Sequence, residues 1–391
     1  MGNPYPLKRN MRKSFQGSIV LGKGFVVTTE QAQALIAKDP RNKDVLFPYL
    51  NGEDLNNDPE QKPSRWVINF FDWSEEKART YPDCFEIVER LVKPERMKLD
   101  ETKNSTNKQR KQNWWKYGSD AKSLYEAISK VDQVMAVAQV SKTLAFTFVP
   151  INQVISMMCI ALAFDDYASF CLIQSTIHKE WVQKYASALK SDTRYTPSDV
   201  FETFPFPEIK SIDNEIVMKN IGDEYYSFRK TVMIDFEFGL TKLYNLFHNP
   251  QLAIISKEDY DMETKLFEKK YGKDVFLLNK YLQKIGKSTC YNKLVENVYQ
   301  LRILHKKMDN IVLNAYKWND IDLKHDFYEV DYLPENDRVR FTIHPNARKK
   351  ILKRLLLLNH KQCKEDQIGE SSKKSNRSKA IIQNNLFFDL E

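Results

Sequence analysis

The sequence predicts an α+β protein in which a mixed α/β domain is followed by a mainly α-helical domain. In the first half of the 391 residues, short runs rich in Val, Ile and Phe alternate with helix-forming segments. In the second half, the segments 214–247, 257–284 and 291–318 are long, heavily charged and helically periodic. The change falls at Phe204-Pro205-Phe206-Pro207, because two prolines in four residues interrupt regular structure.

Local signals predict individual elements of the first half. Apolar runs on both sides of Gly22-Lys23-Gly24 predict a hairpin, and Thr28 with Gln31 predicts a capping box that opens a helix. Asp165 or Asp166 is expected to cap a later helix whose apolar face is Phe170, Ile173, Ile177 and Trp181. Further expectations are strands at 65–71, 134–138, 143–149 and 154–163, a helix opened by Asp83 with Glu86, and an exposed loop at 101–112.

The C-terminal part ends in a short β-like stretch at 326–343 and a helix from Pro345 to about residue 360. A polar tail follows, which its composition predicts to be disordered. The predicted organisation is a linker at 1–12, a first domain at 13–208, a helical domain at 209–362 and a disordered tail at 363–391.

The charge distribution favours a polyanionic partner. The net charge is +8, and the segments 90–130 and 348–379 each hold eleven Lys and Arg, against five and three acidic residues. Such segments suit nucleic acid because each neutralised phosphate releases condensed counterions. The alternative for each segment alone is a solvated helix face or tail.

The five cysteines form no C-x-x-C pair, which argues against a disulfide scaffold or zinc site and for a reducing cytoplasm. The polar segment 1–11 does not have the pattern of a signal peptide. The most apolar segment, 144–164, is interrupted by Pro150, Asn152 and Gln153, so it predicts buried strands and no membrane span.

No motif for catalysis is found. The 11 glycines form no cofactor-binding turn, and Asn3-Pro4-Tyr5-Pro6 has the wrong residue order for an adenine-gripping loop, so a linker is favoured. Glu268-Lys269-Lys270 and Asp58-Pro59-Glu60 contain fragments of a nuclease motif but lie in helical and turn contexts. The sequence therefore predicts no catalytic residue, no bound cofactor and no metal site in this chain.

Several short segments follow one another in a specific order over most of residues 10–360. They are Lys13-Ser14-Phe15-Gln16-Gly17-Ser18, Leu21-Gly22-Lys23-Gly24-Phe25, Leu46 to Leu55, Trp114-Trp115-Lys116-Tyr117, Arg194-Tyr195, Phe204 to Pro207, Leu243-Tyr244-Asn245, Met308-Asp309-Asn310 and Tyr316-Lys317-Trp318. Together they resemble the target-recognition domain and helical C-terminal part of type IIG and IIL (MmeI-like) restriction–modification enzymes. Residues 251–291 look like an insertion relative to that family.

The resemblance implies an S-adenosylmethionine-dependent, adenine-specific DNA methyltransferase of restriction–modification or phage defence, with its catalytic domain on a neighbouring segment or partner subunit. This chain would then bind double-stranded DNA and specify the sequence. The family's base-contacting residues map to Lys190, Asp192, Thr193, Arg194 and Tyr195. Arg suits guanine O6 and N7, and Asp suits cytosine N4; on a strand Asp192 and Arg194 face the same side, although a surface ion pair is the alternative.

Five further residues are candidate contacts to the DNA backbone: Arg110, Asn113, Lys116, Lys142 and His178. His178 lies one helical turn from Trp181, and the sequence alone favours a core or surface histidine over a phosphate contact there. Two other functions stay open at this point. The chain could be a complete enzyme with an unrecognised site, which would bind S-adenosylmethionine alone. It could also be a protein-interaction scaffold, which would show no salt-dependent DNA affinity.

Overall fold

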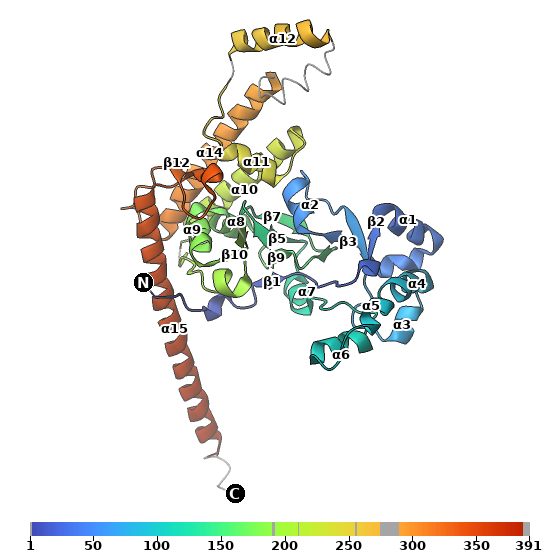
Figure 1. Cartoon of the computed structure of the whole chain (residues 1–391). Coiled ribbons are helices and arrows are strands. Elements are labelled where there is room, and N and C mark those ends of the chain that lie inside the picture. Colours follow the sequence, from blue (N-terminus) through green and yellow to red (C-terminus); the bar gives the residue numbers. More distant parts are fainter. Residues whose placement is uncertain (1, 190–191, 210, 255, 274–288, 386–391) are drawn as a thin grey trace.

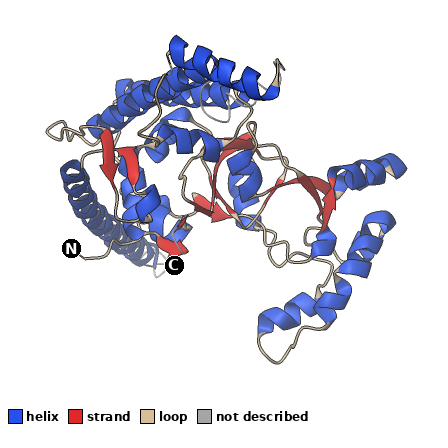
Figure 2. Cartoon of the chain, turned by 45° about the horizontal axis from the view of Figure 1, so that its top comes forward, coloured by secondary structure: helices blue, strands red, loops and turns tan. Residues whose placement is uncertain are grey.

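A computed structural model describes residues 2–189, 192–209, 211–254, 256–273 and 289–385. Strands lie at the centre of the molecule and helices surround them (Figure 2). Figure 1 shows an N-terminal lobe on one side, a central sheet, and a helical region that ends in the long helix α15 (Pro345–Asn385). The α+β class predicted from the sequence is confirmed.

The N-terminal lobe, residues 18–128 together with β8, is built on a four-stranded sheet of order β2-β4-β3-β8. Its strands are β2 (Val26–Thr28), β3 (Leu46–Leu50), β4 (Arg65–Ile68) and β8 (Val154–Ile155). Its helices are α1 (Thr29–Lys38), α2 (Gly52–Asn57), α3 (Glu75–Arg79), α4 (Pro82–Leu91), α5 (Lys93–Met97), α6 (Ser105–Gln112) and α7 (Lys122–Ile128). β8 pairs parallel with β3, so a strand distant in sequence closes the sheet.

The capping box at the start of α1 is confirmed. The Thr28 hydroxyl accepts a hydrogen bond from the Gln31 amide at 3.2 Å, and the Thr28 amide donates to the Gln31 side chain at 3.0 Å. The box satisfies two of the amides that a helix start leaves without a partner. Asp166 caps α8 (Tyr167–Gln174) in the expected way, because its carboxylate accepts from the Ser169 amide at 2.7 Å.

The central sheet has the order β1-β9-β5-β7, and all its neighbouring strands are antiparallel. Its strands are β1 (Ser14–Gln16), β5 (Gln133–Ala138), β7 (Thr147–Pro150) and β9 (Cys159–Leu162). Alternate side chains of β5 and β9 enter two different cores, so that Met135 packs with the helices and Val134 packs towards α7. Burial on both faces explains why these strands are continuous apolar runs in the sequence.

One continuous hydrophobic core joins this sheet to the helical region. The helices are α9 (Thr176–Tyr185), α10 (Ile212–Asp235), α11 (Leu240–Phe247), α12 (Lys257–Tyr271) and α14 (Thr289–Ala315), and the hairpin β12 (Asp326–Glu329) with β13 (Val339–Thr342) precedes α15. Gly222 lets α10 cross α8 closely, since a Cβ there would lie 2.1 Å from the Tyr167 carbonyl oxygen. The core therefore continues across residue 208 without a division.

Five expected elements differ from the structure. The hairpin around Gly22-Lys23-Gly24 is absent from the described fold, because those residues form a short 3-10 helix and β2 pairs with β4. The expected loop at 101–112 contains helix α6, which is capped by Asn104. Pro82, and not Asp83, occupies the start of α4, and the Asp83 carboxylate contacts Lys38 instead.

The helix expected after Asp166 is split into α8 and α9 at Ser175, whose hydroxyl accepts from the His178 amide and caps the second piece. The four residues predicted for its apolar face are all buried. The last helix extends past the expected end near residue 360 and continues to Asn385, through most of the segment expected to be disordered.

Candidate nucleic-acid interface

The predicted base-contacting segment forms a small three-stranded sheet of order β10-β11-β6. Its strands are β6 (Val140–Ser141), β10 (Ser187–Leu189) and β11 (Asp192–Arg194). Thr193 pairs with Ser141, and Arg194 pairs with Val140. β6 follows directly after the central strand β5, and the Tyr195 amide donates to the carbonyl of the linking Gln139 at 2.8 Å. The central sheet therefore holds β11 at a fixed register.

Asp192 and Arg194 lie two residues apart on β11 and so point to the same side of the strand. Arg194 is exposed, and within the described part of the chain its guanidinium has no ion-pair partner. One carboxylate oxygen of half-buried Asp192 has no hydrogen-bond partner among the described residues. Thr193 points the other way, and its hydroxyl donates to the Gln183 side chain at 3.0 Å. Lys190 lies outside the described residues.

Tyr195 and His178 need a correction, because both side chains are closed off from solvent. Tyr195 is 1% exposed and His178 is fully buried. The Tyr195 hydroxyl lies 3.3 Å from Nε2 of His178, whose Nδ1 lies 2.8 Å from the Ile173 carbonyl oxygen. Burial lowers the pKa of His178 to about 3, so the ring is neutral at physiological pH. These two residues anchor the strand to the core, and neither is placed to contact DNA in this fold.

The residues predicted to contact the DNA backbone lie in two places. Lys142 follows β6 beside the candidate base-contacting strand, and its amine is 3.6 Å from the Asp337 carboxylate. Arg110 and Asn113 are on and just after α6, and the Lys116 amine donates to the Asp72 carbonyl at 2.8 Å. Figure 1 shows α6 in the N-terminal lobe and β10 beside the central sheet. The fold thus brings Lys142 next to β11, whereas Arg110, Asn113 and Lys116 stay predictions.

A cleft of about 740 Å³ begins beside β6, and sequence reasoning did not identify it. Its walls come from residues 20–23, from residues 49–57 and from the central strands, including Val140, the partner of Arg194. The polar side chains that line it are Lys23, Tyr49, Asn51, Glu53, Asn56, Asn57, Arg65, Ser156 and Thr241. Two segments of the family resemblance, Leu21 to Phe25 and Leu46 to Leu55, meet here, which is the signal that could have located the cleft.

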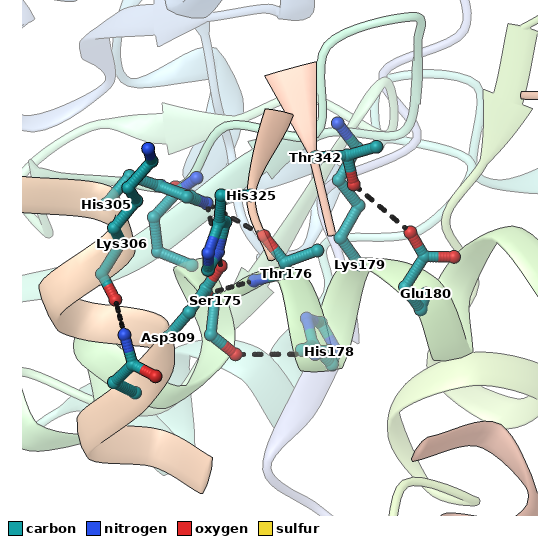
Figure 3. A network of polar contacts seen from close by, with 12 residues as sticks. Ser175, Thr176, His178, Lys179, Glu180, His305, Lys306, Asp309, His325 and Thr342 are labelled. Atoms are coloured by element: carbon teal, nitrogen blue, oxygen red, sulfur yellow. Dashed lines mark hydrogen bonds and ion pairs between the residues drawn. The ribbon is translucent and has the colours of Figure 1, made fainter. Parts of the chain in front are cut away.

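A cluster of polar and titratable side chains is buried inside the helical region (Figure 3). The Asp309 carboxylate accepts from the Thr176 amide and from His325, both at 2.7 Å. His305 lies 2.9 Å from the Thr176 hydroxyl, and burial lowers the pKa of its ring to about 4 although Asp309 acts in the opposite direction. Because these groups are buried, with Asp309 fully so and His305 7% exposed, the cluster is structural.

No group of three or more metal-ligating side chains is found among the described residues. Within the same part of the chain, no helix is both long and apolar enough to cross a bilayer.

The Asn3-Pro4-Tyr5-Pro6 segment packs along α15, where the Tyr5 amide donates to the Asn359 side chain at 2.9 Å. A Cβ at Gly24 would lie 2.5 Å from Cβ of Leu91, so this glycine serves close packing between η2 (Lys23–Phe25) and α4.

Comparison with known proteins decides the family. Residues 6–208, just over half of the chain, match the model of the MmeI target recognition domain. The chain belongs to this family. No curated protein sequence matches it.

The target recognition domain family also accounts for the fold. A solved structure of the type IIL restriction-modification enzyme MmeI in complex with DNA matches with a TM-score of 0.55 and 14% sequence identity. The match covers 93% of this chain but 36% of the MmeI chain, so this chain spans about a third of that enzyme. The similarity therefore extends beyond the recognition domain into the helical region.

Proposed function

We propose that the chain is the DNA-recognition part of a type IIL restriction–modification enzyme that methylates adenine at N6 and serves in phage defence in the cytoplasm. The single observation that carries the proposal is the position of Arg194. It is exposed, its guanidinium has no ion-pair partner among the described residues, and it lies on a strand whose register the core fixes, within the segment 6–208 that matches a target recognition domain.

The chemistry of β11 suits contact with base edges. A two-stranded β-ribbon fits the major groove, where arginine can donate two hydrogen bonds to guanine O6 and N7, and aspartate can accept one from the cytosine amino group. Asp192 and Arg194 point to one side, so both can meet the same groove. Lys142, beside the same strand, is a suitable contact to a phosphate.

Methyl transfer needs a partner in this proposal. The described residues include no glycine-rich turn that leads from a strand into a helix, and Gly24 serves packing. S-adenosylmethionine and the target adenine would therefore be held by a methyltransferase domain or subunit that this chain accompanies. The expected result is that the chain alone does not bind S-adenosylmethionine, whereas the assembled enzyme does.

The test is selection of bound duplexes from a randomised pool, by the chain with its methyltransferase partner, followed by affinity measurement over a range of salt concentration. We expect a short consensus sequence and an affinity that falls steeply with salt. In Arg194→Ala, discrimination at one base pair should fall by about 1–3 kcal/mol while the other positions keep their preference. Absence of duplex binding at low salt would overturn the proposal.

The matched control is Arg65→Ala. Arg65 is also an exposed, strand-borne arginine, and it lines the cleft on β4. Its loss should weaken binding to all duplexes alike and reduce the salt dependence by about one phosphate contact. If Arg194→Ala and Arg65→Ala give the same uniform weakening, Arg194 is a phosphate contact and the assignment of β11 as the base-contacting strand is wrong.

A further inference from the structure

Leu21 has an unusual position on the wall of the cleft. Its side chain is 42% exposed although it is large and apolar, and its backbone has φ +41°. This left-handed conformation is uncommon for residues other than glycine, and it is followed by Gly22 at φ +142°. Non-glycine residues held in such conformations cluster at ligand-contacting sites, because the surrounding structure must enforce them.

The surrounding structure does enforce this conformation. The buried Arg96 guanidinium donates to the Leu21 carbonyl at 2.7 Å and also reaches the Lys116 carbonyl at 3.5 Å. A Cβ at residue 118 would lie 2.8 Å from a terminal methyl of Leu21, so Gly118 leaves the space that the leucine needs. Arg96 therefore fixes the backbone of the loop, while the Leu21 side chain stays on the cleft wall.

The rest of the cleft combines positive charge with a second large apolar side chain that is exposed. Lys23 and Arg65 are exposed and line the cleft, whose one acidic lining residue is Glu53. Met158 lines it too and is 47% exposed. Duplex DNA matches this combination, because its phosphates are anionic while the faces of its stacked base pairs are apolar. Proteins that bend or open DNA insert apolar side chains between such base pairs.

We propose that Leu21 is a wedge that enters the base-pair stack next to the sequence contacted by β11, with Met158 supporting it across the cleft. The inference rests on the proposed function. The cleft links the base-contacting strand to the wedge, because Val140 lines the cleft and pairs with Arg194 on β11. Leu21 would thereby hold the duplex in one register, which makes it a positioning residue and not a catalytic one.

The experiment places 2-aminopurine, whose fluorescence rises when it is unstacked, at successive positions of the recognised duplex bound to the assembled enzyme. The target adenine is left out of the comparison, because a methyltransferase takes its target base out of the stack whatever residue 21 is. At the other positions we expect a several-fold rise at one base-pair step with the wild type and no rise at that step with Leu21→Gly. The glycine variant removes the side chain and also suits the left-handed conformation, so its melting temperature should stay close to that of the wild type. Leu21→Met should retain the rise.

The matched control is Leu357→Ala on α15, which removes another exposed leucine, 59% accessible, and should leave the fluorescence unchanged. Sequence-selective binding by the wild type without a fluorescence rise at any position other than the target adenine overturns the wedge alone. A rise that persists in Leu21→Gly, or a large drop in the melting temperature of that variant, also overturns it. Failure of the wild type to bind duplex DNA overturns the proposed function and the wedge with it.

Discussion

The cleft beside β6, with the neighbouring strand β11, and the cluster around Asp309 both gather polar and charged side chains, but they differ in access to solvent. Arg65 and Lys23 in the cleft and Arg194 on β11 are exposed and have no ion-pair partner within the described residues, so their hydrogen-bonding capacity is free for a ligand. Asp309, by contrast, is fully buried and accepts hydrogen bonds from Thr176 and His325. The comparison shows that burial of polar groups marks a stabilising network here, whereas exposure without partners marks a binding surface.

The largest effect expected is that of Asp309→Ala on stability. Removing the carboxylate leaves the Thr176 amide and the His325 ring buried without their acceptor, which should lower the free energy of unfolding by about 3–5 kcal/mol. Urea unfolding measures the change. In the control, Asp322→Ala removes an exposed carboxylate from a nearby segment and should alter stability by at most about 0.5 kcal/mol. Equal effects of the two substitutions would remove the distinction between the regions.

Acid should destabilise the sealed cluster next. His305, which faces Thr176, Tyr225, His325 and Asp309, has a pKa lowered to about 4, whereas its pKa in the unfolded chain is about 6.5. Between these values the unfolded chain binds more protons, so stability falls as the pH falls from 6.5 to 4.

The pKa difference at His305 corresponds to about 3 kcal/mol, and buried His178 adds to the loss with the same sign. Urea unfolding at pH 7 and pH 4.5 measures the change. The His305→Gln variant should show a shallower dependence over the same range. A wild-type stability that is unchanged over this range would show that His305 is protonated in the folded protein.

Tyr195→Phe separates support from recognition within one segment. The substitution leaves Nε2 of buried His178 without its partner, so stability should fall by about 1–3 kcal/mol. Base preference should stay the same, because the tyrosine does not reach the surface. The paired measurement is thermal unfolding and duplex selection on the same variant. A changed consensus with unchanged stability would return Tyr195 to the base-contacting residues.

The smallest effect expected is that of Arg194→Ala on stability. The side chain is exposed and makes no ion pair within the described structure, so the free energy of unfolding should change by at most about 0.5 kcal/mol. Thermal unfolding of the free protein checks this. A larger loss would mean that Arg194 supports the hairpin, and the contrast with Asp309 would then be weaker.

The local elements were predictable because their signals lie within a few residues. Thr28 with Gln31 and Asp166 with Ser169 form the expected helix caps, and the apolar segments at 134–138 and 154–163 contain strands. Sequence reasoning missed the break at Ser175 and the role of Gly24. Both depend on packing against other segments, which local propensity does not encode.

The sequence by itself determined the α+β class, the caps, the alternation of Asp192 with Arg194 and the family resemblance, since periodicity, short-range hydrogen bonding and residue order are all present in the chain. Only the tertiary structure decided that Tyr195 and His178 are buried, and that Leu21 faces the same cleft as Arg65. The physical reason is that burial and enforced backbone conformations come from contacts between segments dozens of residues apart, such as Arg96 with the Leu21 carbonyl.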